Sequence, residues 1–161
     1  MRKGFRDDPQ HGVGAIQDWV WSGRNHTSCT ETKYPADLPR CAFFDYLIEN
    51  SDRHKGNFFI TDGGKIQLID HDLSFNTGTK RDVRTGNAVL VQHALHKTIP
   101  RDLMQRAVDT VMSVTEGFRR LGMEEKAIQR YQERVELVRK RLETGSPIDV
   151  DMLVSDYLRR E

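Results

Sequence analysis

Residues 45–75 read DYLIENSDRHKGNFFITDGGKIQLIDHDLSF, and the order of apolar and polar residues in this stretch decides the fold. Its first residues continue an apolar run from Leu38 that covers more than one helical face, which predicts a helix buried on most sides. Two β-prone runs at residues 58–61 and 65–69 flank the tripeptide Asp62-Gly63-Gly64, which predicts a tight hairpin. We therefore expect a helix, a polar loop and a two-stranded ribbon.

The polar loop between the helix and the ribbon carries the candidate chemistry. Asp52 is followed five residues later by Asn57, which is the spacing of kinase catalytic loops. In such loops the Asp accepts the proton of the attacking hydroxyl, and the Asn oxygen reaches a metal. A ribbon brings its two ends side by side, so we expect Asn57 and Asp70 to share a hard cation. Mg²⁺ prefers such oxygen ligands and completes its shell with waters and phosphates.

The string DYLIENSDRHKGNFFI, followed by KIQLIDHDLSF, resembles the catalytic core of the phosphatidylinositol 3-/4-kinase-like branch of the atypical kinases. Members of that branch carry an N-x-D-R-H/G-x-x-N loop and an I-D-x-G-L-x-F metal segment. HipA-type kinases and a group of secreted kinases share parts of the same frame. The resemblance is dense over residues 43–75.

The resemblance implies a role for each matched residue. Asp52 corresponds to the catalytic Asp, Asn57 to the metal-binding Asn, and Asp70 to the metal-binding Asp of the DFG-like segment. Arg53 and His54 lie where residues of such families keep the active-site backbone in shape. His54 is therefore counted with Asp52 and Asn57 among the catalytic residues, in a supporting role. The implied cofactors are ATP, bound through Asn57 and Asp70, and Mg²⁺, with Mn²⁺ as an alternative metal.

The chain departs from the family pattern in two places. Asp72 stands where members usually have a small residue, and its extra carboxylate either strengthens metal binding or impairs nucleotide approach. The 51 residues before Asp52 contain no glycine-rich phosphate loop and no V-A-I-K-like strand lysine. We therefore expect a protein-kinase-like C-lobe that is mainly α with a small β-hairpin (α+β), with its N-lobe missing.

The domain organisation follows from this reading. Residues 1–13 are charged and without period, which predicts a flexible lead-in. The kinase-like C-lobe then spans residues 14–161. Within it we expect a hinge-like strand at residues 14–21, the catalytic core at residues 37–75 and a helical subdomain at residues 98–161.

The helical subdomain shows clear periodicity. From Pro100, apolar residues recur at three- and four-residue spacing until Gly122, which stands where a glycine ends a helix. The pattern repeats over residues 124–142, with Gly145 as its stop. Pro147 begins a final short segment that can pack as a last helix.

Composition excludes several classes of protein. The 161 residues hold 25 Lys and Arg against 24 Asp and Glu, so no basic excess points to a nucleic-acid partner. No apolar run is long enough to cross a bilayer, and the first residues lack the apolar stretch of a signal peptide. Two cysteines in such a chain are expected to be reduced thiols, which predicts a cytoplasmic protein.

Two other metal chemistries fit less well. His71 and Asp72 spell the dyad of HD phosphohydrolases, which need further His and Asp residues on surrounding helices, whereas this pair follows a strand. His26, Cys29 and Cys41 offer three zinc ligands, but no fourth is evident and Cys41 falls on the buried helix face. His26 and Cys29 are better explained as residues of a polar loop, and Cys41 as a thiol of the core.

The function implied is ATP- and Mg²⁺-dependent phosphoryl transfer to a hydroxyl acceptor on a lipid, a protein or a small molecule. The expected partners are the nucleotide, that hydroxyl-bearing substrate, and a separate N-lobe or regulatory protein. The alternative is a truncated or degenerate kinase fold that serves as a binding or regulatory module without catalysis of its own. The basic residues Lys80, Arg81 and Arg84 either belong to a solvated loop or line a substrate or phosphate site.

Overall fold

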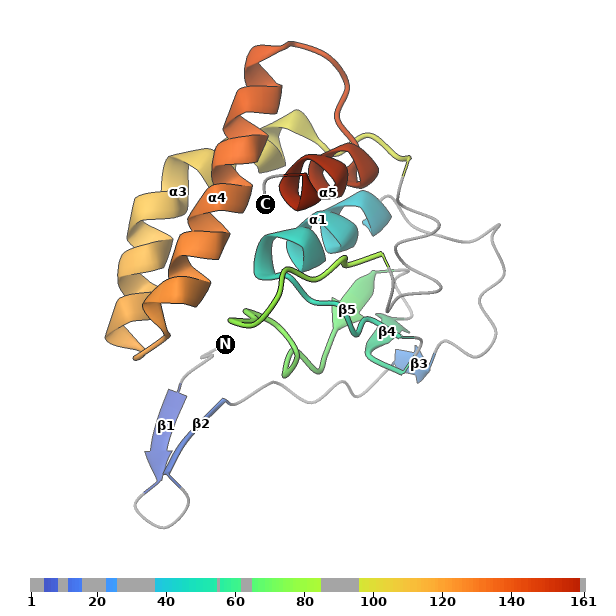
Figure 1. The fold of residues 1–161 in the computed structure, drawn as a ribbon. Helices are drawn as coiled ribbons and strands as arrows, with labels where there is room; N and C mark the ends of the chain where they lie inside the picture. The colour runs from blue at the N-terminus through green and yellow to red at the C-terminus, as the bar shows by residue number, and fades with distance from the viewer. Residues whose placement is uncertain are drawn as a thin grey trace.

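The computed structural model describes residues 5–8, 12–15, 23–25, 37–54, 56–61, 65–84 and 96–159. Over these residues the chain is mainly helical with two small antiparallel sheets, which confirms the predicted mainly α fold with a small β part (Figure 1). The elements are β1 Phe5–Asp8, β2 Gly12–Ala15, β3 Gly23–Asn25, α1 Leu38–Ile48, β4 Phe58–Thr61, β5 Ile66–Leu68, α3 Arg101–Arg120, α4 Glu125–Glu143 and α5 Val150–Leu158.

Helix α1 lies at the centre of the fold and is buried on nearly every side, as its run of apolar residues predicted. Pro39 is tolerated in its first turn because an N–H there has no partner within the helix. Of its eleven residues only Arg40 and Phe44 are exposed. The core around it joins α1 to β4, the loop after β5, helices α3, α4 and α5, and the segments before α3 and α5. Its buried residues are Leu38, Ala42, Phe43, Tyr46, Phe58, Val83, Ile99, Met104, Leu137, Val138, Leu142, Ile148, Val150, Leu153, Val154 and Tyr157.

Strands β4 and β5 form the predicted hairpin, with Phe58 opposite Leu68 and Ile60 opposite Ile66. The turn predicted at residues 62–64 lies outside the described residues. The other edge of β4 pairs with β3, which no sequence pattern predicted because its residues, GRN, are not β-prone. The result is a three-stranded antiparallel sheet in the order β3, β4, β5.

A second hairpin, β1 with β2, lies in the N-terminal part of the chain, where Phe5 is opposite Ala15 and Asp8 opposite Gly12. The predicted lead-in of residues 1–13 therefore contains regular backbone pairing. Such pairing needs only main-chain N–H and C=O groups, so an unpatterned sequence can form it. The hinge-like strand expected at residues 14–21 coincides with β2 at residues 14–15, and its remainder lies outside the described residues.

The three helices of the second half lie where the periodicity placed them. Gly122 and Gly145 follow α3 and α4 with φ of 73° and 71°, the left-handed conformation that glycine adopts without steric cost. Helices α3 and α4 lie side by side (Figure 1), and the N–H of Ile99 donates to the carbonyl of Ile148 at 2.8 Å. This bond ties the start of α3 to the approach of α5.

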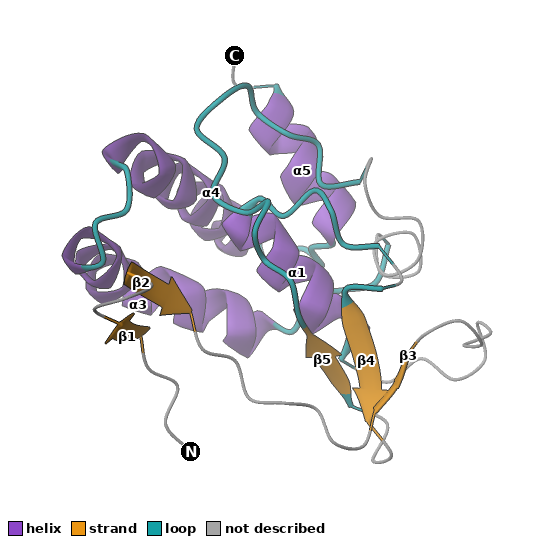
Figure 2. Ribbon diagram, turned by 90° about the horizontal axis from the view of Figure 1, so that it is seen from below, coloured by secondary structure: helices purple, strands orange, loops and turns teal. Residues whose placement is uncertain are grey.

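Figure 2 shows α1 between the three-stranded sheet on one side and helices α4 and α5 on the other. The loop after α1 and the segment after β5 therefore emerge where the helices meet the sheet. None of the described helices is long and apolar enough to span a membrane.

Candidate active site

The two predicted metal ligands flank the open end of the β4–β5 hairpin, Asn57 directly before β4 and Asp70 two residues after β5. The N–H of Ile69 donates to the carbonyl of Asn57 at 3.0 Å, so Asp70 follows directly on a residue paired with Asn57. Asn57 is buried, whereas Asp70 is exposed. The hairpin thus delivers both residues to one edge of the sheet.

Arg53 holds that edge together from the inside. Its side chain is fully buried, and its Nη1 donates both to the carbonyl of Asn57, at 2.5 Å, and to the carbonyl of Ile69. Its Nη2 lies 2.9 Å from Nδ1 of His71. Because a guanidinium only donates, Nδ1 of His71 is the acceptor in this contact. One cation therefore orients the backbone on both sides of the hairpin end.

Asp45 on α1 is the counter-charge of Arg53, and the sequence reasoning missed it. Nε of Arg53 donates to Oδ1 and Oδ2 of Asp45 at 3.3 and 3.0 Å, and Nη2 donates to Oδ1 at 2.9 Å. Both side chains are completely buried. Burial raises the pKa of the Asp45 carboxyl, and the hydrogen bonds and charge of Arg53 oppose that rise. The available signal was a lone carboxylate within an otherwise apolar helix, a position where acids occur only when paired.

The polar loop after α1 is held by hydrogen bonds to its backbone, which leave the Asp52 carboxylate available. The Asp52 N–H donates to Oδ1 of Asn50 at 3.0 Å, and its carbonyl accepts from Nδ2 of Asn57 at 2.8 Å and from the His54 N–H at 2.8 Å. Within the described part of the chain, the Asp52 carboxylate itself makes no hydrogen bond or ion pair. A half-exposed carboxylate on a braced loop is suited to receive a proton.

His54 shapes the loop. Its side chain is exposed, and its Nδ1 accepts the N–H of Gly56 at 3.0 Å. A Cβ at Gly56 would come within 2.9 Å of Cε1 of His54, so only glycine lets the ring close over the turn. These contacts fit the supporting part expected of His54.

The residues present fit a hard divalent cation. Nδ2 of Asn57 faces the carbonyl of Asp52, which can only accept, and this assigns the amide nitrogen and turns its oxygen away from that carbonyl. Asp70 has a φ of 54°, a left-handed conformation that Asp tolerates better than most residues, and its carboxylate is exposed. An amide oxygen and a carboxylate oxygen are the donor types that Mg²⁺ takes before waters and phosphates complete its shell.

Backbone strain concentrates at this site. Among the described residues, the non-glycine residues with positive φ are Glu49, Asp70 and Phe75, with φ of 56°, 54° and 54°. Left-handed backbone costs an L-residue about 1–2 kcal/mol. Surrounding bonds maintain it, including one of 2.7 Å from the N–H of Phe75 to the carbonyl of Ile48.

The structure bears on both alternative metal chemistries. His71 contacts Arg53, so one nitrogen of the HD pair is already engaged. Cys41 lies in the core as predicted, and burial, with the negative charges of Asp45 and Asp37, raises the pKa of its thiol to about 12. The zinc candidates His26 and Cys29 lie outside the described residues. Among the residues described, no cluster of three or more His, Cys, Asp or Glu side chains occurs.

The basic residues of the long loop have different surroundings. Nζ of Lys80 lies 4.8 Å from the centre of the Tyr157 ring, and Arg84 pairs with Asp82 and Asp151 at 2.7 Å each. Both residues therefore fasten the loop to α5.

Arg81 lines a hollow of about 420 Å³ together with Asp72, Ser74 and residues of the α3–α4 turn. Its side chain is therefore part of a surface hollow beside the segment that follows Asp70.

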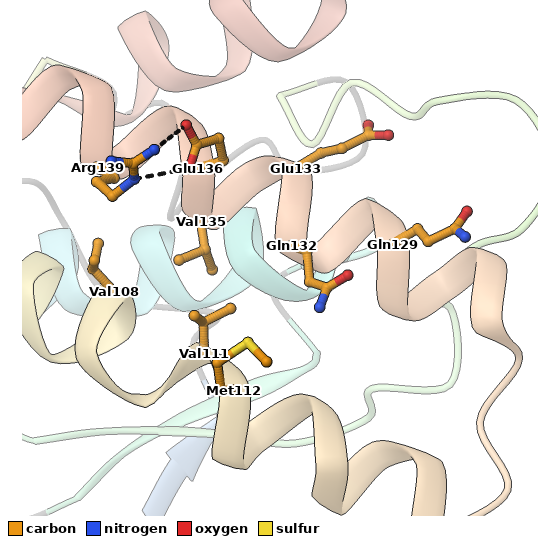
Figure 3. Close-up of a pocket in the computed structure, with 9 residues that line it drawn as sticks. All are labelled: Val108, Val111, Met112, Gln129, Gln132, Glu133, Val135, Glu136 and Arg139. Carbon is orange, nitrogen blue, oxygen red and sulfur yellow. Dashed lines mark hydrogen bonds and ion pairs between the residues drawn. The ribbon is translucent and has the colours of Figure 1, made fainter.

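A second groove, of about 540 Å³, runs between α3 and α4 (Figure 3). Val111 and Met112 of α3 face Val135 of α4 across it, and Arg139 pairs with Glu136 at its rim. None of the predicted site residues lines this groove.

The comparisons with known proteins agree with the geometry. The family model described as phosphatidylinositol 3- and 4-kinase matches residues 16–146, more than half of the chain, and this range contains Asp52, Asn57 and Asp70. No curated protein and no solved structure matched the chain. From the family match, with the loop and hairpin that carry its motifs, the chain belongs to the phosphatidylinositol 3- and 4-kinase family.

Proposed function

We propose that this protein transfers the γ-phosphoryl group of ATP, with Mg²⁺, to a hydroxyl acceptor. The observation that carries the proposal is the position of Arg53, which donates to the carbonyls of Asn57 and Ile69 and so brings Asn57 and Asp70 to one edge beside the loop of Asp52. Family membership supports the reaction class.

Each residue has a defined part in this proposal. The Asp52 carboxylate takes the proton of the acceptor hydroxyl as the new O–P bond forms and the bond between the γ-phosphorus and the β–γ bridging oxygen breaks, so that ADP leaves. Asn57 and Asp70 would hold Mg²⁺, which when bound supplies neutralising charge to the phosphates. His54 and Arg53 hold the backbone of the loop in place. Most of the rate enhancement would then come from positioning and charge stabilisation.

The hollow lined by Asp72, Ser74 and Arg81 is the proposed place for the acceptor. It follows Asp70 directly along the chain, and Nη1 of Arg81 lies 3.4 Å from Oγ of Ser51, the residue before Asp52. The hollow combines hydrogen-bond donors with carboxylate acceptors, which suits a group that both gives and receives hydrogen bonds, such as a hydroxyl.

Calorimetry with the full chain tests the proposal. Titration with ATP is compared with and without Mg²⁺, and ADP release is then measured with three kinds of acceptor: phosphatidylinositol vesicles, a hydroxyl-rich protein and free polyols. Mg²⁺-dependent binding together with acceptor-dependent ADP release is the expected result.

The alternative, a binding or regulatory module, is judged by the same experiment. Mg²⁺-dependent nucleotide binding without ADP release for any acceptor would favour that module. Absence of binding at millimolar nucleotide would contradict the proposal. A thermal-shift measurement checks the same point, since a ligand at 100 times its Kd stabilises a protein by about 2.7 kcal/mol.

A further inference from the structure

Glu49 ends α1 in a backbone conformation that suits glycine. Its φ of 56° and ψ of 40° are left-handed, and its N–H returns to the carbonyls of Asp45 and Tyr46. Glycine is the usual residue at such a helix end because it has no Cβ to clash. Here a glutamate occupies it with its side chain completely buried. A buried carboxylate at a strained position indicates that the side chain has specific partners.

Those partners come from three separate segments. Oε1 of Glu49 accepts the backbone N–H of Arg81 at 2.8 Å. Oε2 accepts Nη1 of Arg134 at 2.8 Å and the hydroxyl of Tyr157 at 3.4 Å. Arg134 is itself 1% exposed, and its Nε donates to the carbonyl of Leu47 at 3.0 Å. The Glu49 carboxylate thus joins the end of α1 to the long loop, α4 and α5.

The joined segments are those that carry the candidate site. Asp52 lies three residues after Glu49 on the same loop. On the other side, Nη1 of Arg81 lies 3.4 Å from Oγ of Ser51 and 3.4 Å from the carbonyl of Leu73. The loop of Asp52 and the segment that follows Asp70 are therefore fastened to each other through Arg81, whose backbone Glu49 holds.

We propose that Glu49, with Arg134 as its counter-charge, is a positioning residue that sets the loop of Asp52 against the segment that follows Asp70. This inference rests on the proposed function. Glu49 is buried and does not line the hollow, so it acts through the backbone N–H of Arg81, whose side chain contacts Oγ of Ser51. Small displacements of reacting groups slow the chemical step far more than they weaken binding. The proposal therefore concerns kcat rather than the KM for nucleotide.

The test is Glu49→Gln in the full chain, with Asp156→Asn as the matched control. Asp156 also pairs with an arginine of α4, Arg141, at 2.6 and 2.9 Å, but it contacts no residue of the site. Glu49→Gln is expected to lower kcat for ADP release by about tenfold or more with the KM for Mg²⁺·ATP within about twofold. Asp156→Asn should leave both constants unchanged.

Amide hydrogen exchange gives a readout that needs no activity. Glu49→Gln is expected to accelerate exchange at residues 50–54 and at the Arg81 N–H, while Asp156→Asn does not. If the wild-type chain releases no ADP, the proposed function fails and this exchange pattern alone judges Glu49. Equal exchange in both variants, or an unchanged kcat in Glu49→Gln, overturns the proposal. If Glu49→Gln does not fold, Glu49→Gly suits the left-handed backbone and carries the same expectations.

Discussion

The N–H of Ile69 donates a 3.0 Å hydrogen bond to the carbonyl of Asn57, and Arg53 donates to the carbonyls of both residues. These bonds fix the position of Ile69 beside Asn57, and they therefore also fix the backbone from which the next residue, Asp70, extends. The proposed metal site therefore depends on backbone pairing and one buried guanidinium as much as on its two ligands.

Replacing the carboxylate of Asp70 should abolish metal-dependent nucleotide binding. Asp70→Asn keeps the size of the side chain but removes the charge that a hard cation prefers. The stabilisation by Mg²⁺·ATP, about 2.7 kcal/mol at 100 times Kd, should be lost in a thermal-shift measurement. Asp109→Asn removes an exposed carboxylate of α3 that lies outside the proposed site, and it is the control. An equal loss of stabilisation in the two variants would contradict the ligand assignment.

Asp52→Ala should separate binding from transfer. The Asp52 backbone is held by Asn50, His54 and Asn57, and these bonds survive removal of its side chain. Calorimetric binding of Mg²⁺·ATP should therefore remain near the wild-type value, while acceptor-dependent ADP release should disappear because no group takes the hydroxyl proton. Full transfer by this variant would show that another residue acts as the base.

Breaking the buried pair of Arg53 and Asp45 should destabilise the fold strongly. Asp45→Asn leaves the Arg53 cation buried without its counter-ion, which costs about 3–5 kcal/mol, measurable by urea unfolding. The double variant Asp45→Leu with Arg53→Met removes both charges and should recover much of that loss. It should not recover transfer, because the carbonyls of Asn57 and Ile69 then lose their common donor. Transfer at the wild-type rate in the double variant would contradict the role given to Arg53.

The loop bearing Asp82 should contribute stability that depends on pH. Burial works against ionisation, but the hydrogen bonds and charge of Arg84 hold the pKa of Asp82 below its usual 3.8. A lowered folded-state pKa gives stability that is present above the usual pKa and is lost as pH falls through the folded one. Asp82→Asn should therefore be less stable by about 0.5–1 kcal/mol at neutral pH.

That difference should vanish as pH falls below the lowered folded-state pKa, where the wild-type carboxyl is also protonated. Urea unfolding of both proteins across this range is the measurement. A difference that stays constant with pH would mean that the Asp82–Arg84 charge interaction is not its source.

Cys41 should be inert in the folded protein. With its pKa raised to about 12, only about one thiol in ten thousand is ionised near pH 8, and the side chain is buried. In a Cys29→Ala background, a thiol-specific chromogenic reagent should label Cys41 only after unfolding in denaturant. Rapid labelling under native conditions would contradict the core position.

Much of the fold could be predicted from the sequence, because local patterns carry it. Continuous apolar residues predicted a buried α1, three- and four-residue spacing predicted α3 and α4, and two β-prone runs predicted the β4–β5 hairpin. The β1 and β3 strands could not be predicted, because their sequences, FRDD and GRN, are poor in β-prone residues and their pairing is made by main-chain groups.

The candidate site likewise contains residues that could be predicted from the sequence and residues that could not. The spacing of Asp52, Asn57 and Asp70 selects them within one continuous stretch. Asp45 and Glu49 were not selected, because their significance lies in partners elsewhere along the chain. Glu49 meets Arg134, which lies 85 residues further along the chain.

By itself, then, the sequence determined α1, the β4–β5 hairpin, the three later helices, and the polar loop with the family to which its residues belong. Only the tertiary structure decided how that loop is held, since a buried carboxylate is stable only when packing brings a cation to it. Arg53 and Asp45 are eight residues apart, and Arg53 also donates to the carbonyl of Ile69 at the open end of the hairpin, 16 residues further along the chain. Arg134, Tyr157 and Arg81 reach Glu49 from three other segments, and no local pattern encodes a meeting that arises from chain folding.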